Sequence, residues 1–137
     1  MGWATKIVVV KNPSDELLWD DFNNKSIQII EWNKTYLAQY MSEVVNNFPE
    51  LGSEIYYKDG NDYHYCGWYY RELTKEVLEE LSKPDSIERF ADMYQEHSWG
   101  FETKKERKEF IKEWKDALKV CKHFVGKFWT KLYWVEG

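Results

Sequence analysis

Aromatic side chains dominate this sequence: 25 of its 137 residues are Trp, Tyr or Phe, and eight of those are Trp. The chain is nonetheless acidic, with a net charge of −5, and 31% of its residues are charged. Rings must therefore supply much of any hydrophobic core that it forms. Tyr and Trp combine a large apolar face with a polar tip, so they also serve as ligand-stacking platforms and as anchors of protein interfaces.

The length predicts one domain spanning residues 1–137, because a chain of this size buries roughly two-thirds of its unfolded surface and seldom divides. No apolar run approaches the roughly 18 to 20 residues of a membrane-spanning helix, and the first residues lack the apolar segment of a signal peptide. Two cysteines are too few for a disulfide framework. We therefore expect a soluble, cytoplasmic protein with reduced cysteines and no cofactor.

Short β-branched runs alternate with segments of helical periodicity, which predicts an α+β fold. Residues 5–11 and 26–32 are rich in Val and Ile, as strands are. Asp59 and Gly60 form a dipeptide typical of hairpin turns and lie between two Tyr-rich runs. The sequence thus predicts a small, mostly antiparallel sheet with a hairpin at 55–66, covered by four to five helices. We expect the hairpin strands within 54–66 and the helices at 34–48, 70–82, 86–97 and 103–132, with a short additional helix between residues 14 and 22.

The C-terminal third has the clearest helical pattern. Thr103 and Glu106 have the spacing of a capping box, which marks a helix start. Behind them, apolar residues recur at spacings of three and four, as on the buried face of a helix: Phe110, Trp114, Ala117, Leu118, Cys121, Val125, Phe128 and Leu132. We therefore extend this helix to about Leu132. The competing interpretation is a terminal strand over residues 127–134, whose aromatic residues also suit a strand.

The same helix predicts a basic stripe of six lysines on its outer side: Lys104, Lys108, Lys112, Lys115, Lys119 and Lys122. Residues 102–131 carry a net charge of +5, whereas residues 1–101 carry −9. An ordinary solvated helix face is one interpretation, and docking between copies of the chain or onto a charged partner is another. Nucleic-acid binding is disfavoured, because the stripe has no Arg and a pI near 5.3 repels polyanions overall.

The densest group of rings lies between residues 56 and 71 and is the main candidate site: Tyr56, Tyr57, Tyr63, His64, Tyr65, Trp68, Tyr69, Tyr70 and the adjacent Arg71. Side chains alternate between the two faces of a strand, so one face of a hairpin cannot bury all of these rings. Three interpretations remain open. The rings fill the core and cover its surface, they form a stacking pocket for a planar ligand whose phosphate binds Arg71 or Lys58, or they form a protein-binding face.

Signals for catalysis or metal binding are weak. His64 and Cys66, and likewise Cys121 and His123, have a spacing that superficially resembles zinc ligands. On a helix, however, Cys121 and His123 point about 160° apart and cannot share a metal. No nucleophile elbow, phosphate-binding loop or metalloprotease motif occurs. Acidic loop residues offer the remaining enzymatic hypothesis, a small hydrolase or transferase: Asp15, Glu16, Asp20, Asp21, Asp59 and Asp62.

In size, acidity and lack of a catalytic motif, the chain resembles the small cytosolic inhibitors of bacteria and phages, such as immunity or counter-defence proteins. This resemblance is compositional and implies a protein that occupies a partner or sequesters a small molecule. Our leading hypothesis is a non-enzymatic binding protein, an inhibitor or accessory factor that docks on a protein partner through aromatic and acidic surface. A nucleotide-like ligand bound by the Tyr56–Tyr70 region is the alternative, and we expect no contact with membranes.

Overall fold

The computed structural model describes residues 4–33, 37–46, 48, 52–97 and 100–137. Within them the chain forms five strands and five helices. Their order is β1 (Ala4–Lys11), α1 (Trp19–Asn24), β2 (Ser26–Asn33), α2 (Ala38–Met41), β3 (Ser53–Asp59), β4 (Asp62–Glu72), α3 (Lys75–Leu81), α4 (Pro84–His97), α5 (Lys104–Phe124) and β5 (Thr130–Glu136).

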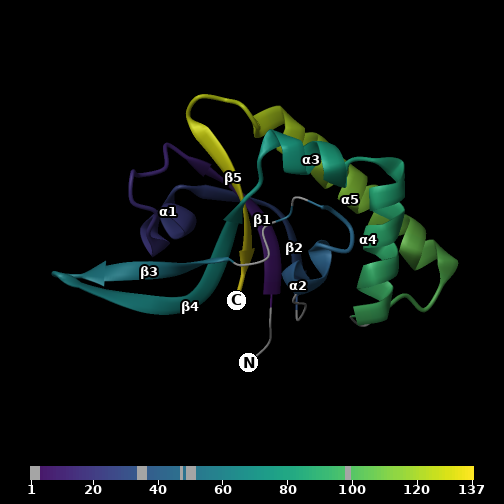
Figure 1. The fold of residues 1–137 in the computed structure, drawn as a ribbon, viewed down its shortest axis with the longest axis horizontal. Coiled ribbons are helices and arrows are strands. Elements are labelled where there is room, and N and C mark those ends of the chain that lie inside the picture. The colour runs from purple at the N-terminus through teal and green to yellow at the C-terminus, as the bar shows by residue number, and fades with distance from the viewer. Residues whose placement is uncertain (1–3, 34–36, 47, 49–51, 98–99) are drawn as a thin grey trace.

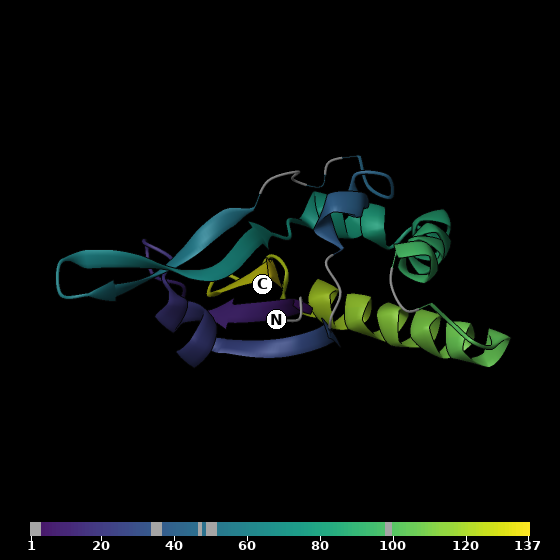
Figure 2. The ribbon, with the colours of Figure 1, turned by 90° about the horizontal axis from the view of Figure 1, so that it is seen from below.

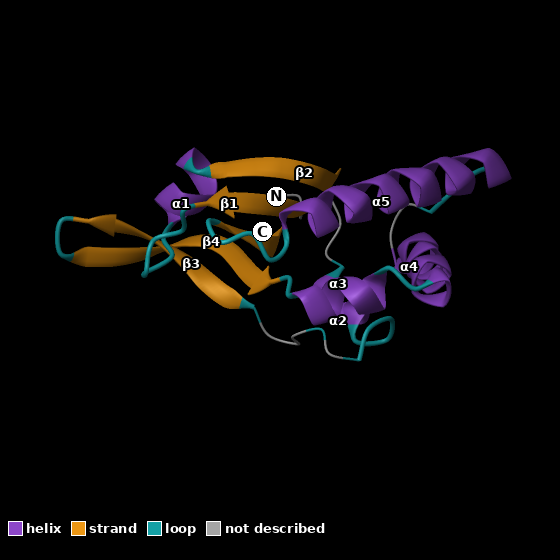
Figure 3. Ribbon diagram, turned by 90° about the horizontal axis from the view of Figure 1, so that it is seen from above, coloured by secondary structure: helices purple, strands orange, loops and turns teal. Residues whose placement is uncertain are grey.

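The strands form one sheet in the order β2-β1-β5-β4-β3, and every neighbouring pair is antiparallel. Helices α2 to α5 contribute to the larger core on one face of the sheet, while α1 contributes to a smaller core on the other face. Figures 1 and 3 show this unequal arrangement, with the long α5 running beside the sheet and extending beyond it. The predicted α+β class is confirmed.

Strand β1 shows why the sheet is covered on both faces. Ile7 and Val9 point into the larger core, and Val8 and Val10 point into the smaller one. All four side chains are almost completely buried. A strand buried on both faces has a continuous apolar run in place of an alternating pattern, which explains the unbroken β-branched segment in this part of the sequence.

The last strand corrects the predicted C-terminal helix. Thr103 does cap α5, accepting a hydrogen bond from the Glu106 backbone N–H at 3.2 Å. The helix ends at Phe124, however, and Gly126 follows with a φ of +82°, a left-handed conformation that favours glycine and commonly ends helices. Phe128, predicted to pack in the core, is fully exposed. The extension to residue 132 is therefore wrong. The alternative of a terminal strand is correct, although the strand spans Thr130–Glu136 and not residues 127–134.

Strand β5 takes a central position in the sheet. It pairs with β1 on one side and with β4 on the other. Its consecutive residues Leu132 to Val135 are buried on alternating faces. Leu132 thus reaches the larger core as predicted, but from a strand. The predicted sheet lacked this strand, without which β1 and the hairpin would not belong to one sheet.

Three other helix predictions need shorter or shifted limits. The predicted helix at 34–48 is regular only over α2 and continues as turns, although Leu37, Met41 and Phe48 are buried as expected; residues 34–36 and 47 lie outside the described residues. The helix predicted at 70–82 begins only at Lys75, because β4 continues to Glu72. The short helix expected from residue 14 begins at Trp19.

A buried carboxylate joins the sheet to α2. Glu136 is completely buried, and both of its oxygens accept hydrogen bonds. Oε1 accepts from Arg71 Nη1 at 3.3 Å and Trp134 Nε1 at 2.8 Å. Oε2 accepts from Thr5 Oγ1 and from two backbone N–H groups at the start of α2. Burial raises the pKa of Glu136, while these donors and the Arg71 charge act in the opposite direction.

Candidate functional site

Strands β3 and β4 form a long hairpin that we call the aromatic arm (residues 53–72). Asp59 and Asp62 are opposite each other at its tip, and Gly60 lies in the turn with a φ of +61°. This confirms the predicted hairpin, which is longer than the expected 54–66. The two turn residues are Gly60 and Asn61, one position later than the predicted Asp59-Gly60. The arm projects well beyond the sheet, away from α4 and α5 (Figures 1 and 2). Its outer part therefore contributes nothing to the larger core.

Four tyrosines on the outer arm are exposed: Tyr56, Tyr57, Tyr63 and Tyr65 have 37% to 46% of their surface accessible. Tyr56 and Tyr65 are cross-strand partners whose ring centroids lie 6.1 Å apart. Tyr65 in turn lies 5.5 Å from the ring of Tyr69. These three rings form a continuous aromatic row on one face of the arm.

The opposite face carries a second aromatic pair. Tyr57 and His64 are cross-strand partners, and their rings stack with centroids 5.1 Å apart. Nearer the tip, Lys58 Nζ lies 5.7 Å from the Tyr63 ring centroid, and the Tyr63 hydroxyl donates to Glu16 at 3.3 Å. Lys58 and Tyr63 lie two positions from Tyr56 and Tyr65 and therefore share their face of the arm. The arm thus presents rings on both faces.

The Tyr56 and Tyr65 hydroxyls of this arm remain protonated at neutral pH, because both pKa values are raised. The hydrogen bond from the Tyr56 hydroxyl to Glu54 raises the pKa of Tyr56, since loss of the proton would place two anions side by side. Burial is the largest cause that raises the pKa of Tyr65, and a hydrogen bond with Tyr69 adds to it. Both hydroxyls thus stay available as hydrogen-bond donors and acceptors.

The base of the arm belongs to the body of the protein. Tyr70 packs against Phe22 and Tyr133, with centroid distances of 5.4 and 5.5 Å. Trp68 is half-buried, and Lys6 Nζ lies 5.0 Å from its ring centroid. Arg71, expected as a phosphate ligand, has only 3% of its side chain exposed and pairs with Glu136. The nine predicted site residues thus divide into an exposed outer group and a packed base.

The basic stripe lies far from the arm. All six of its lysines are exposed on α5, as predicted for the outer side of the helix. Lys115, Lys119 and Lys122 line a pocket of about 280 Å³ whose other residues include Leu118 and Ile87. The arm and α5 extend toward opposite ends of the molecule (Figure 2), so the two predicted surfaces do not combine into one site.

The two cysteines and Asp21 lie in structural settings. Cys121 is buried, which raises the pKa of its thiol to about 12, and partial burial also raises the pKa of Cys66. Asp21 caps the start of α1, accepting from the backbone N–H groups of Ser14 and Leu18 at 3.0 Å each. Among the residues that the structure describes, no three His, Cys, Asp or Glu side chains gather closely enough to hold a metal ion.

Comparisons with protein-family models, with curated proteins and with solved structures find no match to this chain. Its function must be inferred from its own surfaces. The outer arm can bury ring area against another molecule and exchange hydrogen bonds through its phenols. Sequence reasoning located this arm but missed Glu136, because the predicted helix ended nearby and gave no reason to expect a buried carboxylate.

Proposed function

We propose that this chain is a non-enzymatic binding protein, an inhibitor or accessory factor that docks on a partner protein through the aromatic arm. The observation that carries the proposal is the exposure of four tyrosines on a hairpin that projects from the body. Tyrosine is enriched among the residues that dominate interface energies, since it buries a large rigid ring and still offers a hydrogen bond.

The charge of the protein indicates what kind of surface the arm fits. The aromatic arm carries four carboxylates, Glu54, Asp59, Asp62 and Glu72, against two basic side chains, Lys58 and Arg71. Residues 1–101 as a whole have a net charge of −9. A complementary partner therefore has apolar pockets bordered by Lys or Arg side chains, which also accelerate association.

A protein partner suits the arm better than a small planar ligand. Small-ligand sites are concave and surround most of the ligand. Here the rings lie on opposite faces of a hairpin, with Tyr57 and His64 on one side and Tyr56 and Tyr65 on the other. A protein surface that receives the arm as a projection can contact both faces at once.

The experiment uses tagged wild-type protein, the double variant Tyr57→Ser/Tyr65→Ser, and Phe128→Ser as a matched control. Phe128 is a fully exposed ring outside the arm. Each protein is incubated with lysate of the native cells, and the retained proteins are identified by mass spectrometry and titrated by calorimetry. We expect the double variant to lose affinity by roughly 30-fold or more, as for an interface hot spot, and the control to bind as wild type.

The proposal fails if no protein is retained in a manner that depends on the arm tyrosines. It also fails if the retained partner binds the double variant and the wild-type protein equally well. Circular dichroism and thermal melting of all three proteins confirm that the fold is intact in each comparison.

A further inference from the structure

The strand at the other end of the sheet has an unpaired outer edge. β2 pairs with β1 on one side and is the terminal strand of the sheet formed by the described residues. Figure 3 shows β2 at the rim, with α5 running beside it. Exposed edge strands offer a row of backbone donors and acceptors that readily pair with a further strand.

An apolar shelf runs along this edge. A pocket of about 450 Å³ lies between β2 and α5, and its lining includes Ile27, Ile29, Val120 and Phe124. Ile27 and Val120 are 46% and 43% exposed and line the same pocket, so the apolar surface along this edge is shared by the strand and the helix. An added strand would therefore gain backbone hydrogen bonds and also cover apolar surface.

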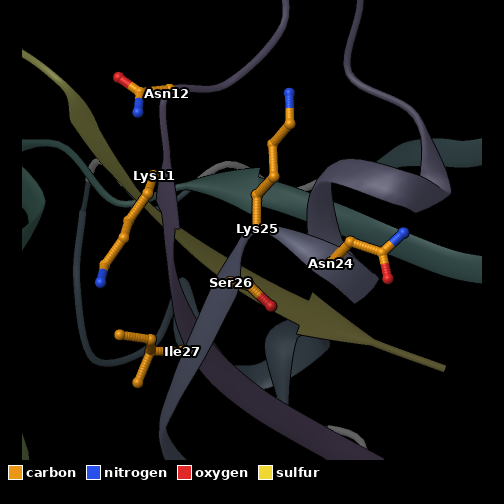
Figure 4. Close-up of a pocket in the computed structure, with 6 residues that line it drawn as sticks. All are labelled: Lys11, Asn12, Asn24, Lys25, Ser26 and Ile27. Carbon is orange, nitrogen blue, oxygen red and sulfur yellow. The ribbon is translucent and has the colours of Figure 1, made fainter.

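The two ends of the edge carry opposite charges. At the beginning of β2, a pocket of about 310 Å³ is lined by Lys11, Lys25 and four uncharged residues that include Ile27 (Figure 4). Toward the end of β2, Glu31 is exposed on the strand, and Glu113 and Asp116 border the shelf from α5. If a second copy of β2 pairs antiparallel with this strand, its acidic end lies beside the basic end of the first copy. Its basic end then lies beside the acidic end of the first copy.

We propose that a second copy of this chain docks on the β2 edge, with the two β2 strands antiparallel about a two-fold axis at Gln28. Counted one residue against one residue from this axis, Ile27 lies opposite Ile29 of the second copy, where Ile29 is the extra residue of the irregular pairing with β1. Lys25, which directly precedes β2, lies beside Glu31 of the second copy, twice over. A two-fold axis perpendicular to the sheet keeps both α5 helices on one side, where they cover the joined apolar shelf. The two sheets become continuous, and the two aromatic arms remain free at the outer ends.

The first test is a cysteine cross-link at the axis. Residues opposite each other in an antiparallel pair have Cα atoms about 4.5 to 5.5 Å apart, within the range of a disulfide. In a Cys66→Ser background, we expect Gln28→Cys to form a covalent dimer on mild oxidation. The matched control Lys58→Cys, exposed on the arm, should stay monomeric. Cross-linking of the control in place of Gln28→Cys would show that the copies meet through the arm and would overturn the proposal.

The second test uses charge reversal and light scattering on the full chain. Wild-type protein should show a concentration-dependent mass approaching twice 16.7 kDa. Glu31→Lys and Lys25→Glu each place like charges together at both ends and should weaken dimerisation by roughly tenfold. The double variant restores opposite charges and should recover most of that loss, even though Lys25 also contacts Asp21 within its own chain.

Recovery in the double variant separates the interface from folding, because the lost Asp21 contact is not restored by a lysine at position 31. A constant mass of 16.7 kDa up to high concentration, together with no excess cross-linking of Gln28→Cys, refutes the second copy as the occupant. Dimers that are equally stable in both single variants and in the wild type refute the β2 register. Neither result bears on the aromatic arm, which these variants leave unchanged.

Discussion

Glu136→Gln is the sharpest test of the buried network that joins the sheet to α2. Within the described part of the chain, the carboxylate accepts from five donors: two side chains, Arg71 and Trp134, at Oε1, and the Thr5 hydroxyl and two backbone N–H groups at Oε2. Glutamine has the same size, but its NH₂ group cannot accept a hydrogen bond. The Thr5 hydroxyl can rotate to become an acceptor. In either orientation of the amide, at least two other buried donors lose their acceptor.

The expected cost follows from these contacts. An orphaned buried donor costs about 1 to 3 kcal/mol, and breaking a buried ion pair by removing one charge costs about 3 to 5 kcal/mol. We therefore expect Glu136→Gln to lower the free energy of unfolding by about 3 to 5 kcal/mol, a large part of the roughly 5 to 15 kcal/mol available to a domain. Urea denaturation followed by tryptophan fluorescence measures this difference.

Glu72→Gln is the matched control for this prediction. It makes the same chemical change on β4, where Glu72 forms a surface ion pair with Lys131 at 3.4 Å and 44% of its side chain is exposed. Surface pairs contribute about 0 to 1 kcal/mol, so this variant should unfold nearly as the wild type does. If Glu136→Gln is no more destabilising than Glu72→Gln, the buried ion pair does not contribute as the geometry indicates.

Three further variants test other parts of the fold. The pKa of Asp21 lies below its ordinary value of 3.8, because its backbone and side-chain hydrogen bonds outweigh burial, which acts in the opposite direction. The Asp21 carboxylate thus stabilises the fold at pH values above 3.8, and this contribution is lost as pH falls through the folded-state pKa. Asp21→Asn should therefore flatten the acid limb of a curve of unfolding free energy against pH. An unchanged acid limb would refute this contribution of Asp21. Trp114 Nε1 is buried and has no hydrogen-bond partner in the described chain, whereas Trp134 Nε1 donates to Glu136. Thermal denaturation should therefore show that Trp134→Phe is more destabilising than Trp114→Phe by about 1 to 2 kcal/mol. Equal melting temperatures of the two variants would contradict the hydrogen bond from Trp134 to Glu136. Gly126→Ala should cost about 1 to 2 kcal/mol, since its φ of +82° is left-handed and an added Cβ meets open space; a neutral result would place the end of α5 elsewhere.

Local signals in the sequence located much of the fold. The Asp59-Gly60 dipeptide predicted the arm, because the turn needs a positive φ that Gly60 adopts without help from distant residues. Likewise, the β-branched run of β1 and the Thr103 cap of α5 identified those elements. The concentration of rings in the arm was visible from composition and spacing. Which rings are exposed was not, since Trp68 and Tyr70 are packed by elements far away in the sequence.

The C-terminus shows where local pattern fails. Leu132 fits both a helical continuation and an alternating strand, so periodicity could not choose between them. Gly126 at the helix end was the available signal, because glycine in a left-handed conformation commonly follows the last helical turn. Glu136 could not be predicted in this way at all. Its partners lie between 2 and 131 positions away in sequence, and only the assembled sheet brings Thr5 and Arg71 to the same carboxylate.

The construction of the arm favours a binding role over a purely structural one. A two-stranded hairpin without a covering layer is marginally stable in water. Beyond Ile55, which is fully buried in the smaller core, the arm is stabilised by its own cross-strand pairs, Tyr56 with Tyr65 and Tyr57 with His64, and by the hydrogen bond from Tyr63 to Glu16. Such pairs contribute about 0.2 to 1 kcal/mol each. The exposed rings therefore also rigidify the surface they form, and a rigid surface loses less conformational entropy when it binds. Serine at these positions removes the contact area and the rigidity together, which is why the arm variants should affect binding far more than they affect the stability of the body.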